Sequence, residues 1–178
     1  MSEFTLGGYM AKHERAAAFE GADGQPYSVA IYVDDEPDEK GRYGAALLFV
    51  RWAPSGDRPV GHVETPVLTT GATPGEANDR LEAWSLFDVK TALDEAIIGH
   101  VRKFVQRNGI GPERFEFQML YGVRRDLQEQ LVQSGCRMRV YIPFGTQWYP
   151  YLMRRLAERP ANIAFILGNI LKESVPGL

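Results

Sequence analysis

The sequence is poor in cysteine and in long apolar runs. Of its 178 residues only Cys136 is a cysteine, which excludes an internal disulfide and favours a reducing compartment. No apolar run is long enough for a transmembrane helix, and the first residues lack the apolar core of a signal peptide. With 44% hydrophobic and 24% charged residues, the composition is typical of a soluble globular protein. We therefore expect a cytoplasmic protein without a membrane span.

Common catalytic and metal-binding motifs are also missing. The sequence contains no G-x-S-x-G, no P-loop and no G-x-G-x-x-G, and its three histidines (His13, His62 and His100) are dispersed without metal-ligand spacing. The acidic stretch 34–41 lacks the pattern of a calcium-binding loop, so we expect a solvated turn there. Cys136 has no histidine near it in sequence, which favours a structural role. The prediction is no metal and no catalytic residue recognisable by motif alone.

Charge is unevenly distributed along the chain. Residues 101–178 contain 12 Lys and Arg against 6 Asp and Glu, a balance of +6, which leaves 8 against 17, or −9, for residues 1–100. This difference predicts a boundary between two parts near residue 100. The basic part has no platform of interleaved aromatic and basic residues, so we expect no nucleic-acid partner.

The first part, 1–109, has the pattern of an antiparallel β-meander. We expect a loosely structured lead-in over 1–13 and strands over 16–20, 27–33, 43–52 and 60–68. Asp23-Gly24 is a strong hairpin signal. Pro66 lacks a backbone donor, which predicts that the last strand lies at an edge of the sheet.

A long helix is expected after the meander. Thr73, Pro74 and Glu76 have the spacing of an N-cap, a first helical position and a capping box. An apolar stripe continues to Phe104 but changes phase near Ser85, which predicts an interruption there, and Asn108-Gly109 predicts the end. No motif for catalysis lies in this part, so we interpret it as a binding or dimerising module.

The second part, 110–178, alternates strands and helices. We expect a strand over 115–121, a helix over 124–134 ended by Gly135, a strand over 138–142 and a further helix after Pro150. This order predicts parallel strands with helical crossovers, in which ligands bind at the C-terminal ends of the strands.

The last predicted helix carries a polar stripe that could bind an amino acid. Tyr151, Arg154, Arg155 and Glu158 follow the spacing i, i+3, i+4 and i+7, which places them on one face. Two guanidinium groups suit a carboxylate and the glutamate suits an ammonium, so the stripe could hold a zwitterion. The alternative is a solvated surface on which Arg154 and Glu158 form an ordinary i, i+4 pair.

Four pieces of this second part carry a family resemblance: FEFQMLYG, RVYIPFG, YLMRRLAE and the following ERPAN. Over about residues 110–173 the chain resembles the end of the proline dehydrogenase (βα)8 barrel. The resemblance implies FAD as cofactor and oxidation of L-proline to pyrroline-5-carboxylate, by hydride transfer to the flavin. It implies that Arg154 and Arg155 bind the proline carboxylate and that Glu158 supports this pair. It also implies that Tyr141 and Tyr151 line the pocket and that Leu120 packs near substrate and flavin.

The resemblance covers only the last two strands and helices of such a barrel. The residues before 110 are too few for six further strand–helix units, because a whole barrel takes about 250 residues. We therefore predict an α+β chain with an unknown first domain (1–109) and a βαβα domain (110–178) that resembles the last quarter of a (βα)8 barrel. It would oxidise L-proline with a homodimer mate or a partner that completes the barrel and covers the exposed strand edge. The alternative is a non-catalytic module that binds proline or another small amino acid, or that mediates dimerisation.

Overall fold

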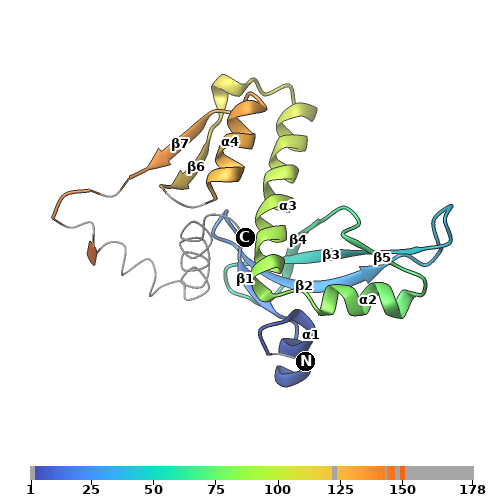
Figure 1. The fold of residues 1–178 in the computed structure, drawn as a ribbon. Coiled ribbons are helices and arrows are strands. Elements are labelled where there is room, and N and C mark those ends of the chain that lie inside the picture. Colours follow the sequence, from blue (N-terminus) through green and yellow to red (C-terminus); the bar gives the residue numbers. More distant parts are fainter. Residues whose placement is uncertain (1–2, 122–123, 143, 147–148, 151–178) are drawn as a thin grey trace, which may run out of the picture. The chain divides into compact units, whose positions relative to one another are not determined.

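The computed structural model describes residues 3–121, 124–142, 144–146 and 149–150 of the chain (Figure 1). Internal contacts divide the chain into two compact units, Met1–Phe104 and Val105–Leu178, with the division inside a helix. Helices and strands are mixed and the larger sheet is antiparallel, so the predicted α+β class is confirmed at this level. The domain boundary between residues 109 and 110 stays a prediction.

The N-terminal segment is a helix, and the expected loose lead-in is wrong. Helix α1 (Leu6–His13) begins at Thr5, whose Oγ1 accepts a hydrogen bond from the Gly8 N–H at 3.2 Å. The segment is anchored at a distance: the Leu6 N–H donates to the Trp84 carbonyl at 2.8 Å, and the Leu6 side chain is fully buried. Because two glycines in the first turn lower helix propensity, this tertiary anchoring decides the structure.

A five-stranded antiparallel sheet forms the body of the first unit (Figure 1). Its strands are β1 (Ala18–Glu20), β2 (Pro26–Val33), β3 (Tyr43–Trp52), β4 (Pro59–Glu64) and β5 (Thr69–Gly71). Neighbours pair in the order β1-β2-β3-β4, and β5 pairs with the start of β3. The predicted meander is confirmed, as is the tight turn at Asp23-Gly24, where Gly24 has φ +74°.

The strand expected over 60–68 is two strands instead. β4 ends at Glu64 and lies at the edge of the sheet, as predicted, while β5 begins at Thr69 and pairs with the same strand, β3. Between them the Thr65 and Leu68 N–H groups still donate to β3 carbonyls, at 3.1 and 2.9 Å. Pro66 has no N–H to donate, so the regular ladder is interrupted there.

The long helix is divided where the change of phase predicts. Helix α2 (Pro74–Glu82) begins after Thr73, whose Oγ1 accepts from the Glu76 N–H at 3.1 Å, and helix α3 (Leu86–Arg107) follows the break. The Glu76 carboxylate accepts from the Ala72 N–H at 2.8 Å, one residue before the N-cap position of a standard capping box. Gly109, with φ +61°, follows the end of α3.

Apolar side chains from the inner sheet face and from the helices form one core in the first unit. Its largest fully buried members are Tyr27, Phe49, Leu6, Leu47, Leu81, Leu93, Val29 and Val89. Burial of this size supplies the main stabilisation of a small unit.

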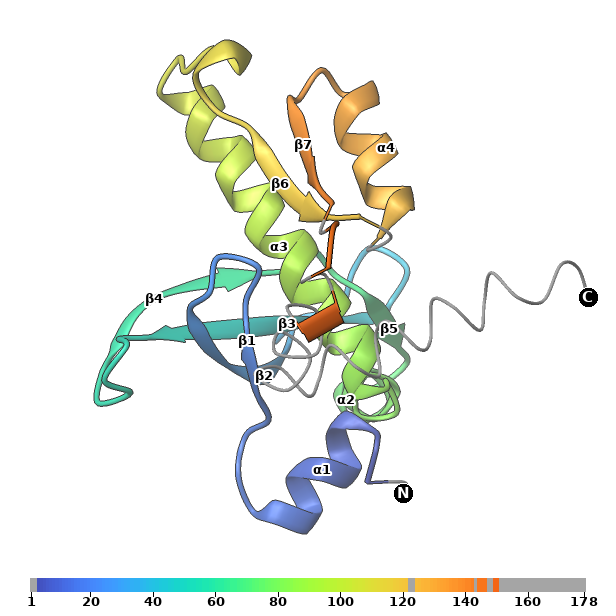
Figure 2. The same ribbon diagram turned by 90° about the vertical axis from the view of Figure 1, so that its left-hand side faces the viewer.

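The second unit contains a parallel strand pair with a helical crossover. A 3-10 turn (Pro112–Arg114) precedes β6 (Phe117–Leu120), helix α4 (Arg125–Gln133) and β7 (Met138–Tyr141). β6 and β7 pair in parallel, so the predicted strand–helix–strand order is confirmed (Figure 2). Leu127 and Leu131 of α4 are buried, and Gly135, with φ +82°, lies just beyond the helix as expected. The helix expected after Pro150 lies outside the described residues, and the barrel stays a prediction.

In the part of the chain that the structure describes, no helix is long and apolar enough to cross a bilayer.

Candidate functional site

Two of the predicted site residues lie side by side at the ends of the parallel strands. Leu120 and Tyr141 are the last residues of β6 and β7 and are partners in the strand register. The pairing continues one step, since the Tyr121 N–H donates to the Tyr141 carbonyl at 2.9 Å. Alternation along a strand places Leu120 and Tyr141 on one face of the pair. This end is where parallel sheets bind ligands.

The same strand ends expose aromatic side chains. Tyr141 is 55% exposed, Tyr121 is 57% exposed and Phe144, three residues after β7, is 87% exposed. Phenol rings in contact with water can pack against a ligand and donate a hydrogen bond to it. The surface is therefore suited to a small molecule with both apolar and polar parts.

Helix α4 contacts the end of β6 through its first turn. The Arg125 guanidinium carbon lies 5.4 Å from the centroid of the Tyr121 ring, and its Nη2 lies 3.4 Å from the Tyr121 hydroxyl. One turn further, the Gln128 Nε2 donates to the Leu120 carbonyl at 3.4 Å. Sequence reasoning missed Arg125 and Gln128 as neighbours of the site. The four-residue spacing of Tyr121 and Arg125 was the available signal, but a strand end and a helix start separate the two residues.

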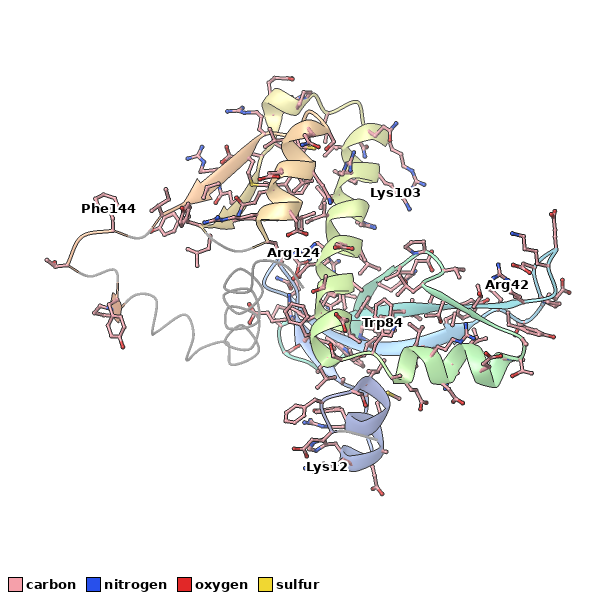
Figure 3. All side chains as sticks on the ribbon, in the orientation of Figure 1. Lys12, Arg42, Trp84, Lys103, Arg124 and Phe144 are labelled. Atoms are coloured by element: carbon pink, nitrogen blue, oxygen red, sulfur yellow. The ribbon has the colours of Figure 1, made fainter. Side chains whose placement is uncertain are left out.

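Arg124, labelled in Figure 3, lies at the start of α4. It forms an ion pair with Asp126. Its Nε and Nη2 donate to the Asp126 carboxylate at 2.9–3.2 Å, and its backbone has a left-handed φ of +46°. The hydrogen bonds from Arg124 lower the pKa of Asp126, so the carboxylate is charged at neutral pH. The charges of Arg124 and Asp126 offset each other at the start of the helix.

A second ion pair links the two strands near their other end. Arg139 Nε lies 2.7 Å from the Glu116 carboxylate, and hydrogen bonds from Arg139 lower the pKa of Glu116. Since ligands bind at the C-terminal ends of parallel strands, this pair holds the two strands together away from the candidate site.

Four predicted site residues lie outside the described residues: Tyr151, Arg154, Arg155 and Glu158. Their roles stay predictions. Within the described ranges, no group of three or more His, Cys, Asp or Glu side chains could hold a metal ion. Cys136 is free and half-buried, with its sulfur 3.7 Å from the Ser134 hydroxyl.

The second unit thus has the strand–helix–strand build of an α/β ligand-binding sheet. The proline dehydrogenase family model matches residues 95–167 of the chain. This match confirms the resemblance inferred from the sequence motifs, and it begins earlier, within α3.

Individual proline dehydrogenases match part of the chain. Proline dehydrogenase of Deinococcus radiodurans is 57% identical over 79 residues, which cover 44% of this chain and 26% of the relative. Proline dehydrogenase 1 and proline dehydrogenase 2 of Bacillus subtilis (strain 168) are 52% and 49% identical over 80 residues, or 45% of this chain and 26% of each relative. The chain therefore matches about a quarter of the length of these curated relatives.

A flavin does not fit the described part of the site by itself. At the strand ends, the described residues offer one wall, made of Leu120, Tyr141 and neighbouring aromatic rings. A flavin also requires contacts on its other side and hydrogen-bond donors for its phosphates. The nearby Arg124 could supply such donors, but it already pairs with Asp126. The described residues match one side of such a site.

Proposed function

We propose that this chain takes part in the oxidation of L-proline to pyrroline-5-carboxylate, with FAD as cofactor, in the cytoplasm. The observation that carries the proposal is the match of the proline dehydrogenase family model to residues 95–167, a range that contains the strand ends. The proposed substrate position is supported by the strand register, in which Leu120 and Tyr141 are neighbours at the C-terminal ends of parallel strands.

In this proposal each side chain has a separate task in holding the substrate. Arg154 and Arg155 bind the carboxylate through paired N–H donors, and Glu158 keeps the two guanidinium groups in place. Leu120 supplies an apolar contact for the ring of proline, while Tyr141 and Tyr151 close the sides of the pocket. The chain itself binds and orients the amino acid.

We further propose that the flavin binds only when a second polypeptide is present. The candidate occupants are a second copy of this chain and a separate partner that supplies further barrel strands. The observation that supports this is that the chain matches about a quarter of its relatives' length.

The test is the visible absorption spectrum of the purified full chain, first alone and with FAD, then after L-proline is added. A bound flavin that bleaches with proline supports the proposed function. A protein that takes up neither FAD nor proline, alone or at concentrations that promote self-association, overturns it. Sedimentation velocity on the same samples shows whether flavin uptake follows assembly.

Arg155→Met tests the carboxylate anchor. The substitution removes one guanidinium fork while keeping an unbranched side chain, so we expect proline binding to fall below detection in isothermal titration, with the melting temperature little changed. Arg114→Met is the matched control, because Arg114 belongs to the same unit and is exposed in the 3-10 turn that precedes β6. Retained binding together with a collapsed melting temperature would show that Arg155 is structural.

A further inference from the structure

The end of β6 is held from two sides, by β7 and by the first turn of α4. On one side the Tyr121 N–H donates to the Tyr141 carbonyl at 2.9 Å. On the other, Gln128 donates to the Leu120 carbonyl and Arg125 lies over the Tyr121 ring. Arg125 and Gln128 are three residues apart, so they share one face of α4. Leu120, the last residue of β6, and Tyr121, which follows it, are therefore each contacted by a side chain of the same helix.

These contacts affect the stability of the strand end because the sheet of the second unit is small. Among the described residues β6 pairs only with β7, and a two-stranded pair without further packing is marginal in water. The terminal residues of a strand are the first to open. Side-chain contacts from α4 therefore decide how well Leu120 stays opposite Tyr141.

We propose that Arg125 and Gln128 are positioning residues for the amino-acid site, an inference that rests on the proposed function. Arg125 fixes the Tyr121 ring and Gln128 fixes the Leu120 carbonyl. Together they keep Leu120 opposite its register partner Tyr141, where the ring of proline would contact both side chains. They act on ring recognition and not on the carboxylate anchor proposed for Arg154 and Arg155.

The proposal predicts a selective loss of affinity. Loss of the α4 contacts lets Leu120 move away from Tyr141. Because the ring of proline packs against both side chains, the affinity for proline falls. L-alanine shares the carboxylate and the ammonium but has no ring, so its affinity stays the same. A general structural role would lower both affinities together.

The experiment compares the full chain with the variant Arg125→Gln/Gln128→Leu, which removes the guanidinium and the amide donor with small changes in volume. Gln130→Leu is the control, an exposed glutamine on the other side of the same helix. Isothermal titration gives the affinities for L-proline and L-alanine, and amide hydrogen exchange followed by NMR gives the protection of the Tyr121 N–H.

We expect the double variant to bind L-proline roughly two- to fivefold more weakly for each lost contact, with unchanged binding of L-alanine and faster exchange at Tyr121. Gln130→Leu should change none of these. Unchanged proline affinity, or an equal loss for both amino acids, overturns the inference. If the double variant does not fold, Arg125→Lys and Gln128→Asn are judged by the same two affinities.

The outcomes separate this inference from the proposed function. An unsubstituted chain that binds no proline overturns the proposed function. In that case the exchange rate of the Tyr121 N–H still shows whether the α4 side chains stabilise the end of β6. A chain that binds proline equally well with and without the two side chains overturns only the positioning role.

Discussion

The two units of this chain differ in how they bury their apolar residues. The first unit encloses fully buried side chains such as Phe49, Leu47 and Leu81 between a five-stranded sheet and helices. In the second unit α4 buries Leu127 and Leu131, while β7 leaves three of its four residues exposed. Aromatic side chains at the strand ends, among them Tyr121 and Tyr141, face solvent. Among the described residues, β7, which lies within the family match, is thus more exposed than the central strand β3 of the first unit.

The two units also differ in the residue that precedes a helix. Helix α2 has Thr73 in the extended conformation of a regular N-cap, with a side-chain hydrogen bond. Helix α4 begins after Arg124 in a left-handed conformation with no side-chain cap. A non-glycine residue in that region costs about 1–2 kcal/mol and is found where surrounding contacts require it. Among the described residues each unit has one such residue, Glu14 just after α1 and Arg124 just before α4, and of the two Arg124 is the one beside the candidate site.

The largest expected effect tests the core of the first unit. Phe49→Ala should destabilise that unit by about 3–5 kcal/mol, because it removes a fully buried ring and leaves a cavity. The matched change Leu131→Ala in α4 removes a smaller buried side chain, so it should cost about 2–4 kcal/mol and act on the second unit. Urea unfolding with residue-resolved hydrogen exchange measures both. If each substitution destabilised both units equally, the two units would unfold as one cooperative structure. The proposed difference between their cores would then be wrong.

A smaller effect is expected in alkaline solution. Burial, together with the hydrogen bond to Asp23, raises the pKa of Tyr27 from 10.0 to about 12. The unfolded chain therefore loses this proton first, so the stabilisation is present below pH 10 and is lost as the pH rises toward 12. By linkage the loss is up to about 3 kcal/mol.

Tyr27→Phe has no phenol proton, so its free energy of unfolding should lack this alkaline decrease. Urea titrations at several pH values between 9 and 12 give the comparison. Parallel curves for the two proteins would show that the phenol is not the group responsible.

The helix caps provide a further prediction. Thr73→Ala removes the acceptor for the Glu76 N–H and should lower the stability of the first unit by about 1 kcal/mol. Thr73→Ser keeps the hydroxyl and should retain most of the stability. The melting temperature by circular dichroism checks both, and equal losses for alanine and serine would argue for packing of the methyl group instead.

The smallest expected effect concerns acid and the second unit. Arg124 holds the pKa of Asp126 below its usual value of 3.8, so the pair stabilises α4 above that pH and is lost as the pH falls through the lower pKa. Asp126→Asn should therefore weaken α4 at neutral pH and remove part of its acid sensitivity. Hydrogen exchange of α4 amides between pH 3 and 6 is the measurement. An unchanged pH profile would assign the acid sensitivity to another carboxylate.

Local patterns predicted most elements of the chain correctly. The alternation in β3, the hairpin at Asp23-Gly24, the phase change at Ser85 and the parallel order of β6 and β7 are all short-range signals. Helix α1 was missed because its stability comes from Leu6 and its backbone bond to Trp84, far away in sequence. The division into β4 and β5 was missed because both strands depend on the same partner, β3.

For the candidate site, the sequence alone determined which residue types occur at the strand ends and that Leu120 and Tyr141 belong to a proline dehydrogenase-like segment. Motifs persist in a sequence because the chemistry of a site needs particular side chains at particular spacings. Only the tertiary structure decided that Arg125 and Gln128 grip the end of β6 and that Arg124 is engaged by Asp126. The physical reason is that these contacts depend on where a helix crosses a strand pair, and this position is set by the packing of Leu127 and Leu131.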